Sequence, residues 1–195
     1  MELWHAWACP YCMRVRIALA EKGIPYRSRE LESSSKPPDP LHLNPTGSVP
    51  MLIDGDDVVV GSLPILDYLC QRWPEPPLFP CGVGRDVVAK AYERIEALFA
   101  PHLPKIARGT PEERVTALGA VRRAMAELDA DTPDGNFLLP QYSVADLALA
   151  SILANLPRDW RPTQLGFERL ARWERAVMQR PTVREQTGPR MALAG

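Results

Sequence analysis

Residues 2–12 read ELWHAWACPYC, a short apolar run followed by two cysteines three positions apart. The apolar run predicts a strand over residues 2–7. Pro10 suits the first position of a helix, where its missing N–H would have had no partner. Cys9 is therefore expected at a helix N-terminus, where free N–H groups and the helix dipole favour a thiolate over a thiol. Cys12, about one turn further on, is then placed to attack a disulfide formed at Cys9.

Composition indicates a globular chain with enough apolar residues for one large domain or two small ones, since 46% of its 195 residues are hydrophobic. The 23 basic and 24 acidic residues nearly cancel, so we expect neither nucleic acid nor a membrane as a partner. We find no charged-then-apolar leader and no apolar stretch near the roughly 18 residues of a membrane span, and therefore expect a cytoplasmic protein.

The paired cysteines have two readings in a reducing compartment, because such pairs are more often catalytic or metal-binding than structural disulfides. A structural zinc site needs four ligands, and the sequence offers no second Cys-x-x-Cys and no His pair. The pattern therefore favours redox chemistry, and we expect no metal. Cys70 falls on an apolar helix stripe with Leu66 and Leu69, so core packing accounts for it.

The segment after Cys9 predicts a helix over residues 10–22 that ends at Gly23. Apolar side chains occupy two neighbouring faces of this helix, so we expect it to be covered on two sides. Arg14 and Glu21 mark the face expected to contact solvent. A second strand follows over residues 24–31, and the intervening helix implies that the two strands are parallel.

A loop, a hairpin and another helix complete the first half of the chain. Residues 33–40 are rich in Ser and Pro and predict a loop. Residues 51–53 and 58–60 flank an Asp-Gly turn, which is typical of a β-hairpin. Ser62 is expected to cap a helix over residues 63–72.

The composition changes sharply at residues 74–84, which contain four prolines and two glycines and resemble an interdomain linker. We therefore divide the chain into an N-terminal domain over residues 1–75, a linker over 76–84 and a C-terminal domain over 85–195. This division gives an α/β domain followed by an all-α domain.

Every segment beyond the linker has helical periodicity, beginning with residues 88–103. Thr110 and Ser143 each open a capping box, with an acidic residue three positions later. The helix after Ser143 is apolar nearly all round, so it is expected at the buried centre of this half. A last helix is predicted over residues 165–179.

Several motifs in order make the chain similar to the glutathione transferases: Cys9-Pro10-Tyr11-Cys12, the Asn44–Pro50 segment, Gly61-Ser62 opening a helix, and Ser143-x-x-Asp146. The resemblance covers nearly the whole sequence. It is closest to the omega-class transferases and to the two-domain bacterial glutaredoxins, which carry Cys-Pro-Tyr-Cys. It implies a thioredoxin-like N-terminal domain followed by a helical-bundle C-terminal domain.

The resemblance also implies a binding site for glutathione. It makes Cys9 the residue that meets the glutathione sulfur, and Pro50 the family's cis-proline. The backbone of Val49 would pair with the cysteinyl part of glutathione. Ser62, at a helix N-terminus, would hold the γ-glutamyl carboxylate, and Lys36 is a candidate for the glycyl carboxylate.

Pro10, Tyr11 and Gly61 complete the residues expected to line the bound thiol. Gly61 departs from the family pattern, which usually has an acidic residue before the serine to pair with the glutathione ammonium. The absence of an acidic side chain at this position removes a contact with the ammonium that is worth about 1–3 kcal/mol. Another low-molecular-weight thiol is therefore an alternative cofactor.

Three functions follow from the resemblance. The first is a glutathione-dependent thiol–disulfide oxidoreductase in which Cys9 is the nucleophile and Cys12 resolves the adduct. The second is a transferase that conjugates glutathione to electrophiles. The third is a non-catalytic binding module, since some proteins of this fold bind partners such as RNA polymerase. The substrate is a disulfide under the first function and an electrophile under the second, and the third has no substrate. A homodimer is possible under each of them.

Overall fold

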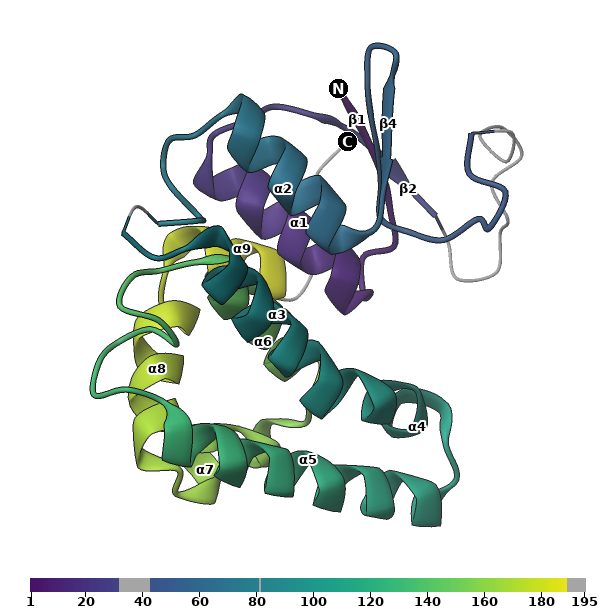
Figure 1. Cartoon of the computed structure of the whole chain (residues 1–195). Helices are drawn as coiled ribbons and strands as arrows, with labels where there is room; N and C mark the ends of the chain where they lie inside the picture. Colours follow the sequence, from purple (N-terminus) through teal and green to yellow (C-terminus); the bar gives the residue numbers. More distant parts are fainter. Residues whose placement is uncertain (32–42, 81, 189–195) are drawn as a thin grey trace.

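The computed structural model describes residues 1–31, 43–80 and 82–188. The predicted loop at 33–40, including Lys36, lies outside the described residues. A sheet-bearing part and a helical part pack against each other (Figure 1). The sheet-bearing part contains, in chain order, β1 (Glu2–His5), α1 (Pro10–Glu21), β2 (Arg27–Glu30), β3 (Met51–Asp54), β4 (Asp57–Val60) and α2 (Ser62–Arg72).

The four strands form one sheet in the order β2-β1-β3-β4. Strands β1 and β2 are parallel, while β3 is antiparallel to both β1 and β4. The expected parallel pair and the hairpin are confirmed, and with them the thioredoxin-like arrangement. The expected cap at Ser62 is wrong, because Gly61 occupies the N-cap position of this helix with a φ of +96°, which favours glycine. Ser62 is the first residue of the helix itself.

The helical part contains α3 (Arg85–Phe99), α4 (Leu103–Arg108), α5 (Pro111–Asp131), α6 (Val144–Ala154), α7 (Pro162–Leu165), α8 (Glu168–Met178) and α9 (Pro181–Thr187), with short 3₁₀ turns at Ala100–His102 and Arg158–Trp160. Both predicted capping boxes are present, at Thr110 and at Ser143. Helix α6 is buried over most of its length, as its apolar sequence predicts. Among the described residues, no helix is long and apolar enough to cross a membrane.

Helix α1 lies between the two parts of the molecule. It packs beside α2 and also contacts α6 and α9 of the helical part (Figure 1). Cover on two sides is therefore confirmed, but the expected solvent face is wrong. Arg14 is fully buried, and the Glu21 carboxylate accepts two hydrogen bonds from Arg180, at 2.8 and 2.7 Å. Both charged residues face the helical part, where they find charged or polar partners.

The C-terminal helices differ from the single helix predicted over residues 165–179. Gly166, with a φ of +78°, ends α7 in a left-handed turn before α8 begins. The prediction also missed α9, a helix of only 7 residues with one buried apolar side chain, Val183. So short a helix is held by tertiary contacts, including the hydrogen bond from Thr182 to Glu21.

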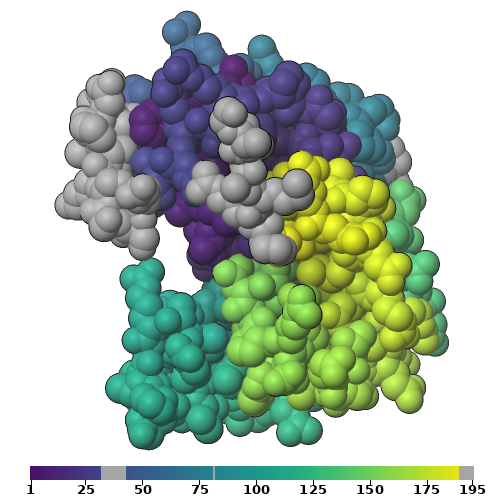
Figure 2. Space-filling view, turned by 180° about the vertical axis from the view of Figure 1, so that it is seen from behind, coloured from purple at the N-terminus to yellow at the C-terminus, as the bar shows by residue number. Residues whose placement is uncertain are grey.

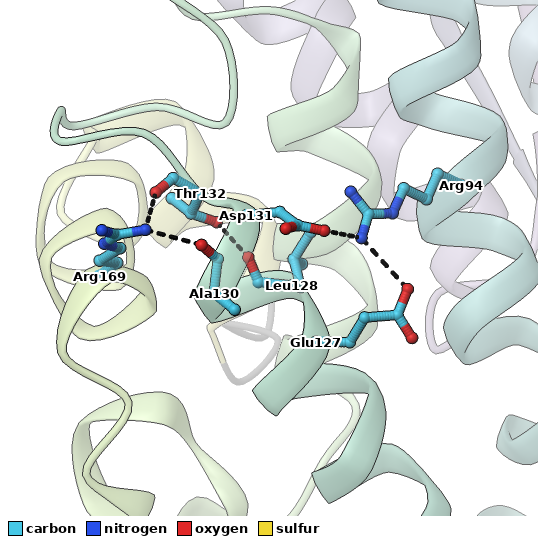
Figure 3. A network of polar contacts seen from close by, with 7 residues as sticks. All are labelled: Arg94, Glu127, Leu128, Ala130, Asp131, Thr132 and Arg169. Atoms are coloured by element: carbon cyan, nitrogen blue, oxygen red, sulfur yellow. Dashed lines mark hydrogen bonds and ion pairs between the residues drawn. The ribbon is translucent and has the colours of Figure 1, made fainter.

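The end of α5 is a junction of three helices (Figure 3). Arg94 of α3 forms ion pairs with Glu127 and Asp131 of α5. Arg169 of α8 donates to two backbone carbonyls at the end of the same helix, one of them that of Thr132, at 2.7 and 3.2 Å. A guanidinium is favoured there because the last carbonyls of a helix lack partners and carry partial negative charge.

Candidate active site at the start of helix α1

Three predicted groups of site residues meet at one edge of the sheet. Trp4 lies opposite Met51 in the antiparallel pair of β1 and β3, so Pro50 lies beside the end of β1 from which the Cys9 loop departs. The N–H of Gly61 donates to the Pro50 carbonyl at 2.9 Å, which places the start of α2 next to the same point. The sheet register therefore gathers α1, the proline turn and α2.

The residues before β3 have the backbone expected of a ligand cradle. The Val49–Pro50 peptide bond is cis, as the resemblance implies. Pro50 is buried, while Val49 is only partly buried. The turn that leads to them is held by Asn44, whose side-chain amide donates to the Ser48 carbonyl at 2.7 Å.

Cys9 is the N-cap residue of α1, with Pro10 in the first helical position. A hydrogen bond from the Cys12 thiol, together with the N–H groups of Cys12 and Tyr11, lowers the pKa of Cys9 to about 6 against the opposing effect of burial. The charge of Arg14 acts in the same direction. Cys9 is only partly buried and is not in a disulfide, and its lowered pKa favours the thiolate over the thiol at neutral pH.

Cys12 is held in the opposite state. It is fully buried, and its sulfur accepts a hydrogen bond from the N–H of Ala6 at 3.5 Å. Its hydrogen bond to Cys9, burial and the negative charge on Cys9 together raise the pKa of Cys12. The pair therefore shares one proton, which stays on Cys12 while Cys9 is the thiolate.

Alkylation of the reduced protein by iodoacetamide should reveal this asymmetry. Only the thiolate reacts with iodoacetamide. The rate of Cys9 alkylation should therefore be nearly constant at neutral pH and above, and should fall to half of that value near pH 6. Cys12→Ala removes the donor and should move the midpoint upward, toward the roughly 8.5 of an ordinary thiol. Cys12→Ser keeps a hydroxyl donor and should retain a low midpoint. The measurement is mass spectrometry of quenched samples, and equal midpoints in all three proteins would contradict the role of Cys12.

The loop that carries Cys9 is braced by Arg16, which sequence reasoning missed. This buried guanidinium donates to the Trp7 carbonyl at 3.0 Å and the Ala6 carbonyl at 3.4 Å, and lies over the Trp7 ring. Its Nε donates to the side chain of Gln186 in α9 at 3.1 Å. The sequence does contain a sign of this role, which is an arginine among the apolar residues of a helix expected to be covered on two sides. Such a charge can be buried only where acceptors are provided for it.

A second buried guanidinium, that of Arg14, connects α1 to the start of α2. Arg14 donates to Tyr92 and to Glu96, both of α3, at 2.6 Å each, and to Ser151 of α6 at 3.1 Å. The Tyr92 hydroxyl is in turn 2.8 Å from that of Ser62. This Arg14–Tyr92–Ser62 chain crosses the boundary between the two parts of the molecule, and Tyr92 and Glu96 were also missed from the sequence.

The surface is hollowed between the N-terminal residues, purple in Figure 2, and the helical residues below them. Fold and site together define a two-part protein with a thioredoxin-like sheet, a helical bundle and a cysteine pair at the start of α1. Residues 3–77 match the family described as glutathione S-transferase, N-terminal domain. The expected resemblance is thereby supported over the first part of the chain.

Relatives extend the match to the second part. A stringent starvation protein A homolog of Pasteurella multocida is 36% identical over 162 residues, covering 81% of this chain and 73% of the relative. The crystal structure of glutathione transferase Omega 3C from Trametes versicolor matches with a TM-score of 0.77 and 26% identity, over 97% of this chain and 89% of that one. The chain belongs to the glutathione S-transferase superfamily.

A sphingomonad glutathione S-transferase complexed with glutathione has the same fold, with a TM-score of 0.81 at 21% identity over 96% of this chain and 97% of that one. Of the site residues expected from the sequence, the structure brings together Cys9, Cys12, Pro10, Tyr11, Val49, Pro50, Gly61 and Ser62. Lys36 stays a prediction, since it lies outside the described residues.

Proposed function

We propose that this protein is a glutathione-dependent thiol–disulfide oxidoreductase in which Cys9 is the nucleophile and Cys12 the resolving thiol. The observation that carries the proposal is the pairing itself. A partly exposed thiolate sits at a helix N-terminus, and a buried thiol donates to it. A thiol whose pKa lies near neutral pH is largely ionised there and remains a good nucleophile, and disulfide exchange requires both properties.

In the first step, the Cys9 thiolate attacks the glutathione sulfur of a mixed disulfide. A bond forms between the two sulfurs, the original disulfide breaks, and the substrate leaves as a thiolate that takes a proton from solvent. The product on the enzyme is a Cys9–glutathione disulfide. No electrons are gained or lost overall, because one disulfide replaces another.

Two routes remove the adduct. A second glutathione thiolate attacks the glutathione sulfur, releasing oxidised glutathione and restoring the Cys9 thiolate. Alternatively, Cys12 attacks the sulfur of Cys9 and releases glutathione, leaving a Cys9–Cys12 disulfide for two further glutathiones to reduce. Once Cys9 is in a disulfide, the negative charge and the hydrogen bond that raise the pKa of Cys12 are gone. Formation of the adduct therefore activates the resolving thiol.

The cradle around Cys9 supports glutathione as the thiol. Val49, before the cis-proline, would offer its backbone groups to the cysteinyl part of the thiol. The N-terminus of α2 offers N–H groups and the Ser62 hydroxyl to a carboxylate. Gly61 supplies no side chain to pair with an ammonium, so this part of the ligand has to be held elsewhere.

A second candidate is a non-catalytic role. Two relatives that match 81% and 80% of this chain are named stringent starvation protein A homolog, a name that specifies no transfer or redox reaction. The free Cys9 and Cys12 thiols favour catalysis over this alternative.

The decisive experiment measures three properties of the wild-type protein. These are reduction of a glutathionylated peptide, conjugation of a chromogenic electrophile, and calorimetric binding of glutathione. We expect measurable reduction and binding, with conjugation at least about tenfold slower, because a protein nucleophile does not assist a bound glutathione thiolate. Conjugation without reduction would make the protein a conjugating transferase. Binding of no thiol and neither reaction would support the non-catalytic role.

A further inference from the structure

The neighbours of the Ser62 hydroxyl restrict which hydrogen bonds it can donate and accept. It is 8% exposed and lies 2.8 Å from the Tyr92 hydroxyl, which belongs to a side chain that is 3% exposed. Either oxygen could be the donor if the pair stood alone. The pair does not stand alone, because Arg14 contacts the same tyrosine oxygen at 2.6 Å.

The direction of the chain follows from what each group can give. Arg14 has donors only, so it must donate to the Tyr92 oxygen. The Tyr92 proton then has one acceptor among the described residues, the Ser62 oxygen. If Ser62 donated instead, the tyrosine proton would be buried without an acceptor, an arrangement that folded proteins avoid. Tyr92 therefore donates to Ser62, and the Ser62 proton points elsewhere.

The direction of these hydrogen bonds, from Arg14 to Tyr92 and from Tyr92 to Ser62, affects what can bind at the N-terminus of α2. The free N–H groups there donate, and the Ser62 proton, which Tyr92 does not accept, can be donated to a ligand as well. The groups at this point therefore favour a ligand atom that accepts. The guanidinium behind the chain polarises both hydroxyls in the same sense. Arg14 is fully buried, and within the described parts of the chain its Nη2 has no hydrogen-bond partner, so its charge is only partly neutralised by Glu96.

We infer that Tyr92, on α3, is a positioning residue that orients the Ser62 hydroxyl so that its proton is available to the ligand, and so favours thiols carrying a carboxylate at this point. The inference rests on the proposed function, since it concerns the same thiol site. It assigns to the helical part a share in thiol recognition, through the contact of Tyr92 with Ser62.

The test measures binding without redox chemistry, using S-methylglutathione and its analogue in which the γ-glutamyl carboxylate is an amide. By calorimetry, the wild type should bind the carboxylate form at least about tenfold more tightly than the amide. Tyr92→Phe keeps the buried ring and removes only the hydroxyl. It should weaken binding of the carboxylate form about tenfold and reduce the preference over the amide to within about twofold.

Two further variants separate this role from a merely structural one. Ser62→Ala should reproduce the loss from the other end of the chain, and the double variant should be no weaker than either single variant, because all three break one relay. Tyr68→Phe is the matched control, since its hydroxyl donates to Asp54 and Asp57 in the hairpin. It should bind both ligands as the wild type does.

The outcomes distinguish this inference from the proposed function. An undiminished carboxylate preference in Tyr92→Phe, or additive losses in the double variant, would overturn the inference while leaving the oxidoreductase intact. Should Tyr92→Phe fail to fold, an unchanged preference in Ser62→Ala would overturn it in the same way. If the wild type binds neither ligand, glutathione recognition itself is wrong. If the variants show the expected loss of carboxylate preference but the wild type has no reductase activity, the inference is supported and the redox reaction is rejected.

Discussion

Cys9→Ser is expected to abolish reduction of a glutathionylated peptide, lowering kcat/KM by about 10³-fold or more. The serine hydroxyl stays protonated at neutral pH, whereas the wild-type thiol has a pKa of about 6 and is ionised. Binding of S-methylglutathione should survive, because the cradle at Val49 and Ser62 is untouched. The measurement is steady-state kinetics with calorimetry on the same preparation.

Cys12→Ser is the informative partner variant. A second glutathione can still resolve the Cys9 adduct, so activity on the glutathionylated peptide should stay within about tenfold of the wild type. Reduction of an intramolecular protein disulfide, which uses both thiols, should be lost. Cys70→Ser is the matched control, because that buried thiol lies on α2 and takes no part in exchange. Full activity in Cys9→Ser would show that the proposed mechanism is wrong.

Asp146→Ala is expected to lower the free energy of unfolding by about 3–5 kcal/mol, the largest stability effect we predict. The fully buried carboxylate accepts hydrogen bonds from the N–H of Leu138 at 2.9 Å, the N–H of Ser143 at 2.8 Å and the indole N–H of Trp173 at 2.8 Å. Alanine would leave all three donors without this acceptor, at the start of the most buried helix.

Urea titration followed by tryptophan fluorescence measures this change, and Trp173 itself is a probe. The matched control is Asp134→Ala, since that side chain is 78% exposed and makes only surface ion pairs. Its free energy of unfolding should change by less than about 1 kcal/mol. A loss of similar size in both variants would show that the buried acceptor is not what Asp146 contributes.

Local chemistry explains why much of the fold was predictable. Pro10, the Asp-Gly turn and the capping boxes at Thr110 and Ser143 act on neighbouring residues, so their effects can be recognised without knowing the fold. The cysteine pair was predictable for the same reason. Both thiols lie within one helical turn, and the start of that turn determines which of them is ionised.

The errors have two causes, which are partners distant in sequence and weak local signals. Arg14 looked like a solvent-facing residue because its acceptors, Tyr92, Glu96 and Ser151, are at least 78 positions away. Helix α9 was missed because a helix of 7 residues carries too weak a periodic signal to be distinguished from a loop.

The sequence by itself determined the strand–helix–strand unit, the helical second half and the position of Cys9 at the start of α1, because each depends on residues within a few positions of one another. Only the tertiary structure decided what surrounds that cysteine. It placed Pro50 and Gly61 beside the cysteine loop, buried Arg14 and Arg16 under the helical part, and brought the Tyr92 hydroxyl to that of Ser62. A buried charge takes whatever acceptors packing brings to it, and packing joins segments that are far apart in the chain.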